Sequence, residues 1–252
     1  MPNDDLHFEK APIVEAIIAI DVAPSLDDDV MAKLEAALTE VQADYPESEP
    51  LKHFRVQFDV GVDPQQPATT LDVLHGRKYV SADKTQVVAF NRSGFSFSRL
   101  PPYQRWQSFR DEAKRLWTIF RSATGETLIT RFGLRYINRV HIPFNRSMGD
   151  FLTLYPEVPP NADGSLRRVG SSYMRVDGVV NEIRDGRLII QQAMLPPERE
   201  GFATLSLDFD ISVAALSGMR EDFVWEMLER ARNVKNQLFV ASLKPDFLET
   251  FR

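Results

Sequence analysis

The sequence predicts an α+β protein in which antiparallel strands pack against long helices. Apolar and polar residues alternate in several segments, which is typical of half-buried strands. Two longer segments place apolar residues three and four positions apart, which is typical of helices with one buried face. Short polar connections at 82–84 and 92–94 join neighbouring strand segments and favour hairpins. Hairpin connections join antiparallel strands, so we expect an antiparallel sheet.

We expect two similar halves, residues 1–125 and 126–252, that form one compact unit. In the first half, Ser25 and the acidic residues that follow it suit the start of a helix, because a helix N-terminus favours capping side chains and negative charge. The expected strands of this half span 13–22, 53–62, 70–80, 85–91 and 94–100. The expected helices span about 27–44 and about 103–122.

The second half repeats this order of elements without a clear residue-level repeat. The expected strands span 127–143, 172–182, 187–195 and 201–213. A short helix is expected over about 148–155 and a long one over about 219–242. The helical spacing predicts that seven large side chains of the two long helices are mostly buried. They are Trp106, Phe109, Leu116, Trp117, Phe223, Met227 and Leu228.

The order of elements resembles the TATA-box-binding-protein-like or helix-grip architecture. In that architecture a curved antiparallel sheet wraps around a long helix. The resemblance concerns topology and implies no particular function, because one fold supports many functions.

Composition bounds the class of protein. The chain has 252 residues with 43% hydrophobic and 26% charged residues, which is typical of a globular protein and excludes a mainly disordered one. It has no cysteine, which excludes disulfides and thiolate metal sites and fits the cytoplasm. The first ten residues are acidic and polar, unlike a signal peptide, and no apolar run is long enough to span a membrane. We therefore expect a cytoplasmic protein.

Charge is distributed unevenly along the chain. Residues 1–76 contain 16 Asp and Glu but 4 Lys and Arg, whereas residues 77–139 contain 13 Lys and Arg but 4 Asp and Glu. Such asymmetry can mark an anion-binding face. The alternative is that the acidic and basic segments neutralise each other in the folded chain.

The sharpest local feature is a basic strand segment at 130–140. Strand geometry puts Arg131, Arg135 and Arg139 on one face, and these planar cations could hold phosphates or carboxylates. The alternative is a ladder of ion pairs across neighbouring strands, because Asp208 and Asp210 also alternate along a predicted strand. The three arginines are the candidate site for a ligand or a partner.

The same segment carries a family resemblance. APIVEA at 11–16, GLRYINR at 133–139, and NQLF at 236–239 with a downstream Phe251 resemble three landmarks of a sporadically distributed, uncharacterised bacterial family of about this length. The central motif is the most specific of the three. The resemblance implies no activity, cofactor or catalytic residue. The family's patchy occurrence implies mobile or accessory genes, with phage defence as one setting.

The sequence offers little support for catalysis, a metal or a cofactor. Its four histidines lack metal-ligand spacing, and it contains neither a Gly-x-Ser-x-Gly elbow nor a glycine-rich phosphate loop. Asp208 and Asp210 could bind a metal, but an exposed polar strand face explains them more simply. A pI near 5.3 argues against a nucleic-acid partner. The aromatic residues among the basic residues of 99–117 also fall on one helical stripe, so we expect them in the core.

These observations favour a non-catalytic binding or interaction protein, with a protein partner or self-association. The alternative is a helix-grip pocket for a small hydrophobic or anionic ligand. A cavity on the order of several hundred Å³ between sheet and long helix would support the pocket.

Overall fold

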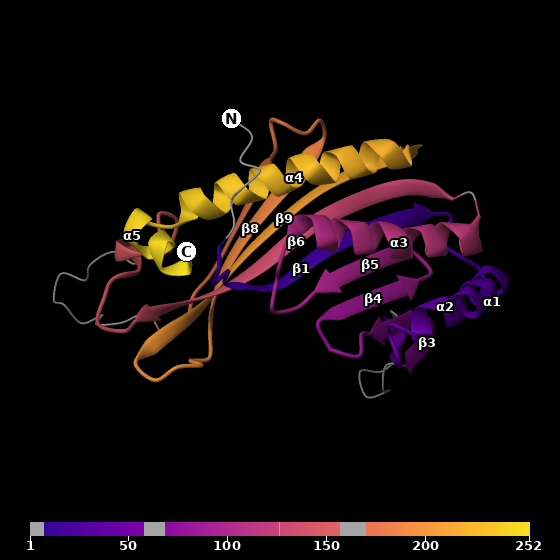
Figure 1. The fold of residues 1–252 in the computed structure, drawn as a ribbon, viewed down its shortest axis with the longest axis horizontal. Coiled ribbons are helices and arrows are strands. Elements are labelled where there is room, and N and C mark those ends of the chain that lie inside the picture. Colours follow the sequence, from indigo (N-terminus) through magenta and orange to yellow (C-terminus); the bar gives the residue numbers. More distant parts are fainter. Residues whose placement is uncertain (1–7, 58–68, 126, 157–169) are drawn as a thin grey trace, which may run out of the picture.

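A computed structural model of the chain describes residues 8–57, 69–125, 127–156 and 170–252 (Figure 1). The strands are β1 (Ile13–Ala23), β2 (Glu47–Gln57), β3 (Thr69–Val80), β4 (Gln86–Asn91), β5 (Gly94–Arg99), β6 (Leu128–Pro143), β7 (Tyr173–Val179), β8 (Gly186–Leu195) and β9 (Phe202–Met219). The helices are α1 (Asp28–Ala37), α2 (Thr39–Gln42), α3 (Trp106–Thr124), α4 (Glu221–Ser242) and α5 (Pro245–Leu248), with short 3-10 turns η1 (Met148–Asp150) and η2 (Glu249–Phe251).

The strands form one nine-stranded sheet in the order β2-β3-β4-β5-β1-β6-β9-β8-β7. All eight neighbouring pairs are antiparallel, which confirms the predicted α+β class and the antiparallel sheet. The centre of the sheet is the pair β1 and β6, which come from different parts of the sequence. None of the described helices combines the length and the apolar composition that crossing a membrane requires.

The alternation of β6 decides which of its side chains enter the core. The helices α3 and α4 lie on one face of the sheet (Figure 1). Phe132, Leu134 and Tyr136 are fully buried on that face, whereas Arg131 and Arg135 on the other face are partly exposed. Successive side chains of a strand point to opposite faces, so one face of this sheet packs on helices and the other is polar.

The two long helices bury most of the predicted residues. Trp106, Phe109, Leu116 and Trp117 of α3 and Met227 and Leu228 of α4 are buried as predicted. The prediction for Phe223 is wrong, because this side chain in the first turn of α4 is 36% exposed. Trp225 is buried instead, with Lys114 Nζ of α3 lying 5.2 Å from its ring. The buried face of α4 is therefore rotated away from Phe223.

Three predicted elements differ from the observed ones. The helix expected over 27–44 is interrupted at Leu38, which separates α1 from α2. The helix expected over 148–155 is only the turn η1, because Leu152 instead forms a β-bridge with Leu243. The strand expected from 53 begins at Glu47, which pairs with Val80 of β3. The expected residues 58–62 of that strand lie outside the described residues.

The boundary between the last strand and the helix after it also differs by a few residues. The strand expected over 201–213 continues to Met219 at the end of β9, and α4 starts at Glu221 rather than 219. Pairing with β6 explains the extension, because Met219 is opposite Ile129 of that strand.

Candidate functional site

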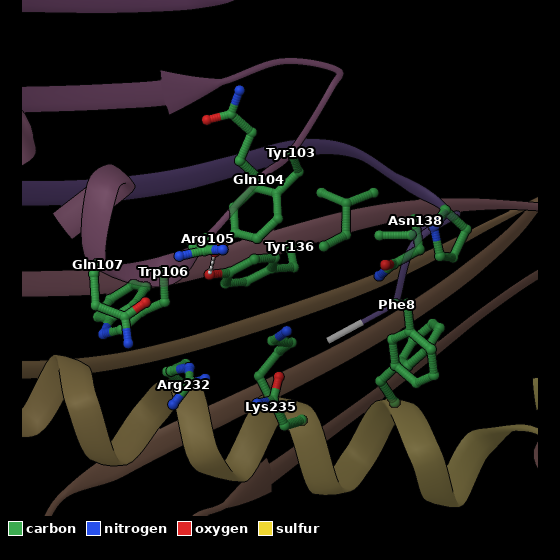
Figure 2. Close-up of a pocket in the computed structure, with 15 residues that line it drawn as sticks. Phe8, Tyr103, Gln104, Arg105, Trp106, Gln107, Tyr136, Asn138, Arg232 and Lys235 are labelled. Carbon is green, nitrogen blue, oxygen red and sulfur yellow. Dashed lines mark hydrogen bonds between the residues drawn. The ribbon is translucent and has the colours of Figure 1, made fainter. Parts of the chain in front are cut away.

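A cavity of about 510 Å³ lies where the start of α3 and the middle of α4 face β6 (Figure 2). Its volume is typical of a site for a small molecule. Aromatic rings and polar groups share its wall. The lining residues are Phe8, Ala11, Pro12, Ile13, Tyr103, Gln104, Arg105, Trp106, Gln107, Tyr136, Asn138, Arg232, Lys235, Asn236 and Phe239.

Two periodicities bring the polar groups of the wall together. Tyr136 and Asn138 are two residues apart on β6, so both point to the helix-covered face. Arg232, Lys235 and Phe239 are three and four residues apart on α4, so they lie on one side of that helix. The cavity therefore places two basic side chains of α4 opposite a tyrosine of the sheet.

Lys235 is the most unusual group of the cavity. Its side chain is buried, and Nζ lies 3.9 Å from the centre of the Tyr136 ring (Figure 2). Burial lowers the pKa of Lys235 to about 7, and the positive charge of Arg232 contributes to this lowering. Among the residues that the structure describes, Lys235 forms no ion pair. A buried ammonium without a counter-charge is costly, so the site favours an anion beside it.

Two tyrosine hydroxyls meet next to Lys235. The hydroxyls of Tyr103 and Tyr136 lie 2.8 Å apart and share a hydrogen bond. Burial raises the pKa of Tyr103 to about 12 and raises the pKa of Tyr136 well above its ordinary value. Both side chains therefore stay neutral near pH 7 and add no negative charge to the cavity.

The first turn of α3 contributes to the positive character of the cavity. Arg105 precedes the helix without capping it through its side chain, and the first turn contains no acidic residue. A helix N-terminus carries a partial positive charge and favours anions. Glu229 of α4 fixes this turn, since it accepts hydrogen bonds from Trp106 Nε1 at 2.7 Å and from Arg110 at 2.5 Å. The Glu229 carboxylate is therefore already bound by two side chains of α3.

The three candidate arginines lie on the opposite face of β6 from the cavity. Arg131 pairs with Asp21 at 3.4 Å, Arg135 with Asp208 at 2.5 Å, and Arg139 with Glu198 at 2.5 Å. Every guanidinium thus has a carboxylate beside it. Of the two aspartates in the predicted ladder, Asp208 is one of these partners, whereas Asp21 lies on β1 and Glu198 lies between β8 and β9. The role of the arginines in binding a ligand or a partner stays a prediction.

A second depression, of about 600 Å³, lies beside the loop that follows α2. Three of its ionic groups pair with each other, because Arg115 contacts both Glu112 and Asp44. The Tyr45 hydroxyl also donates to Glu112 at 2.8 Å. Three arginines and three carboxylates line this depression, whereas the cavity at Lys235 is lined by basic and no acidic side chains, so the cavity is the better site for an anion.

The pair Asp208 and Asp210 does not form a metal site in the described ranges, where no group of three or more His, Asp and Glu side chains could hold an ion. Asp208 is bound to Arg135 instead. Sequence reasoning missed Lys235 and Arg232. The available signal was their position, since two basic residues interrupt the stripe of Leu228, Ala231 and Phe239 at helical spacing.

Comparisons of this chain with protein-family models, with curated proteins and with solved structures found no match.

Proposed function

We propose that this protein binds a small anionic molecule with an aromatic or apolar body in the cavity between α3, α4 and β6. The anion would lie beside Lys235, Arg232 and the first turn of α3, and the apolar body would contact the aromatic rings of the wall. This is the pocket alternative of the sequence analysis, and the cavity volume of about 510 Å³ supports it.

The observation that carries the proposal is the buried amine of Lys235 in an accessible cavity without an ion-pair partner among the described residues. Buried charges in proteins are usually paired. An apolar residue of similar length at position 235 would avoid the cost of burying an amine, and the folded protein would be more stable. A buried lysine at this position therefore points to a function. A bound anion supplies the counter-charge that the site lacks and raises the pKa of Lys235 back towards its ordinary value.

We propose that residues 1–125 and 126–252 are similar halves of a TATA-box-binding-protein-like or helix-grip arrangement. The strand order supports this, because β5 precedes α3 and pairs with β1, while β9 precedes α4 and pairs with β6. We also propose that the protein acts in the cytoplasm and is encoded in an accessory or defence locus. The resemblance of its three motifs to a sporadically distributed bacterial family supports this setting.

Titration calorimetry with a matched pair of probes tests the proposed function. The probe is 2-naphthoate, and its neutral control is 2-naphthamide, which has the same ring system without the charge. We expect the anion to bind at least about tenfold more tightly at pH 6.5, because a hydrogen bond to a charged group contributes about 1.5–3 kcal/mol. Equal affinities would show that charge does not select the ligand.

A further inference from the structure

The strand β7 ends the sheet and leaves one of its edges without a partner in the described part of the chain. The Val180 N–H donates to the Gly186 carbonyl at 2.9 Å, and the Met194 N–H donates to the Ser172 carbonyl at 2.9 Å. The backbone groups of even-numbered residues here therefore point towards β8. Because the direction alternates along a strand, those of Tyr173, Arg175, Asp177 and Val179 point away from the sheet.

This edge lacks proline and net charge, two features that protect an exposed strand. The strand at the opposite end of the sheet, β2, contains Pro50, and Glu47 and Glu49 near it are exposed. In contrast, β7 contains no proline, and its charged residues Arg175 and Asp177 have opposite signs and pair with each other. Three of its apolar side chains are open to solvent. Val176 is 41% exposed, Tyr173 62% and Val179 80%. Such an edge is a template for pairing with another strand.

We propose that two copies of this chain pair along β7 about a two-fold axis at Val176, and so join their sheets. Antiparallel pairing about that axis puts Tyr173 opposite the partner's Val179, and it puts Arg175 opposite the partner's Asp177. All of these residues have outward backbone groups, so they form the hydrogen-bonded pairs of the new ladder. Val176 meets the partner's Val176 on the other face of the strand.

The charges of Arg175 and Asp177 favour the register with its axis at Val176 over the registers with the axis one residue to either side. An axis at Arg175 would put this arginine opposite the partner's Arg175, and an axis at Asp177 would put two aspartates opposite each other. Like charges directly opposite each other are destabilising, whereas opposite charges stabilise the pair. Arg175 and Asp177 of one chain already lie 2.7 Å apart. The axis at Val176 extends this pair into a cluster of four alternating charges.

The proposal is independent of the ligand cavity, since β7 lines no part of it. One seven-residue strand is a small contact, so we expect a weak dimer whose population rises with protein concentration. Sedimentation equilibrium of the full chain between about 1 and about 200 µM covers the range of weak association.

Charge reversal distinguishes the β7 interface from any other. Arg175→Asp and Asp177→Arg each put like charges opposite each other, so each variant alone should remain monomeric. An equimolar mixture of the two single variants should dimerise, because the acidic pair of one variant then faces the basic pair of the other at both positions. The double variant Arg175→Asp/Asp177→Arg should dimerise as the wild type does. The control Arg230→Asp changes an exposed arginine on α4 and should leave association unchanged.

Circular dichroism of all variants checks that they fold, which the exposure of both side chains leads us to expect. A wild type that remains monomeric at the highest concentration would overturn the proposal. So would a wild-type dimer that both single variants preserve, because its interface would then lie elsewhere. Failure of the mixture to dimerise would overturn the register about Val176.

Discussion

Lys235 of α4 places its Nζ atom 3.9 Å from the centre of the Tyr136 ring of β6. The ring face attracts a cation, and it is the only partner the structure gives this amine within the described residues. A ring face compensates only in part for the loss of water. The contact therefore holds Lys235 in the cavity while leaving it able to receive an anion.

Replacing Lys235 by methionine should stabilise the protein at low pH. Burial puts the pKa of Lys235 near 7 in the folded chain, against 10.5 as its ordinary value. Between these values the unfolded chain binds more protons, so the stability of the wild type rises with pH in this window. We expect Lys235→Met to raise the free energy of unfolding by about 2–4 kcal/mol at pH 6, and this gain to shrink by pH 9.5.

Urea denaturation of wild type and variant from pH 6 to 9.5 measures this difference. The tyrosines beside Lys235 do not obscure it, because the raised pKa values of Tyr103 and Tyr136 put their titration in the folded chain above this window. The control Lys33→Met replaces an exposed lysine of α1 and should leave the pH dependence unchanged. Parallel curves for wild type and Lys235→Met would mean that the amine is not desolvated.

Truncating Phe109 should be among the more costly changes in α3. This ring is buried and packs on Phe97 of β5, with ring centres 5.4 Å apart. We expect Phe109→Ala to lower the free energy of unfolding by about 3–5 kcal/mol. Phe223→Ala is the matched control, and its partly exposed ring should cost about 1 kcal/mol or less. Equal losses in denaturant titrations would contradict the burial assigned to the two rings.

The ion pairs on the polar face of β6 should differ in strength according to burial. The Asp208 side chain is 8% exposed and accepts hydrogen bonds from Arg135 at both Nε and Nη2. Arg135→Gln leaves this carboxylate poorly compensated and should cost about 1–3 kcal/mol. The Glu198 carboxylate that pairs with Arg139 is 44% exposed and can be solvated by water, so Arg139→Gln should cost less than about 1 kcal/mol. Urea denaturation of the two variants measures both losses, and a larger loss for Arg139→Gln would contradict this order.

A triple Arg→Gln variant at 131, 135 and 139 separates the structural role from a binding role. Because the arginines lie on the opposite face of β6 from the cavity, the variant should melt earlier and still bind 2-naphthoate. A variant that melts normally but loses a bound partner recovered from the native host would instead favour the binding role.

The sequence predicted the elements that depend on local periodicity. Alternation identified β6 and the two faces on which Tyr136 and Arg135 lie, and helical spacing identified α3 and α4. The errors lie where tertiary contacts decide. Leu38 interrupts a helix that local spacing would continue, and Leu152 pairs with Leu243 across the chain rather than extending η1. Phe223 lies at the margin of an apolar stripe, and spacing alone cannot show which margin is covered.

The candidate site was harder to predict because its residues are far apart in sequence. Tyr103, Tyr136 and Lys235 meet only when β6 lies under both long helices, which depends on the strand order. Basic residues on a helix are usually exposed, so Lys235 was left out of the predicted core. Conversely, the arginines of β6 attracted attention through their spacing, and the carboxylates that pair with them come from other strands and loops.

The affinity of 2-naphthoate for Lys235→Met, measured by titration calorimetry at pH 6.5 and 8.5, tests the central claim most directly. We expect the wild type to bind more tightly at pH 6.5, where Lys235 carries more of its charge, and the variant to bind at least about tenfold more weakly at that pH. The control Arg230→Gln removes a charge from the exposed side of α4 and should bind as the wild type does. Equal affinity of wild type and Lys235→Met at pH 6.5 would contradict the account.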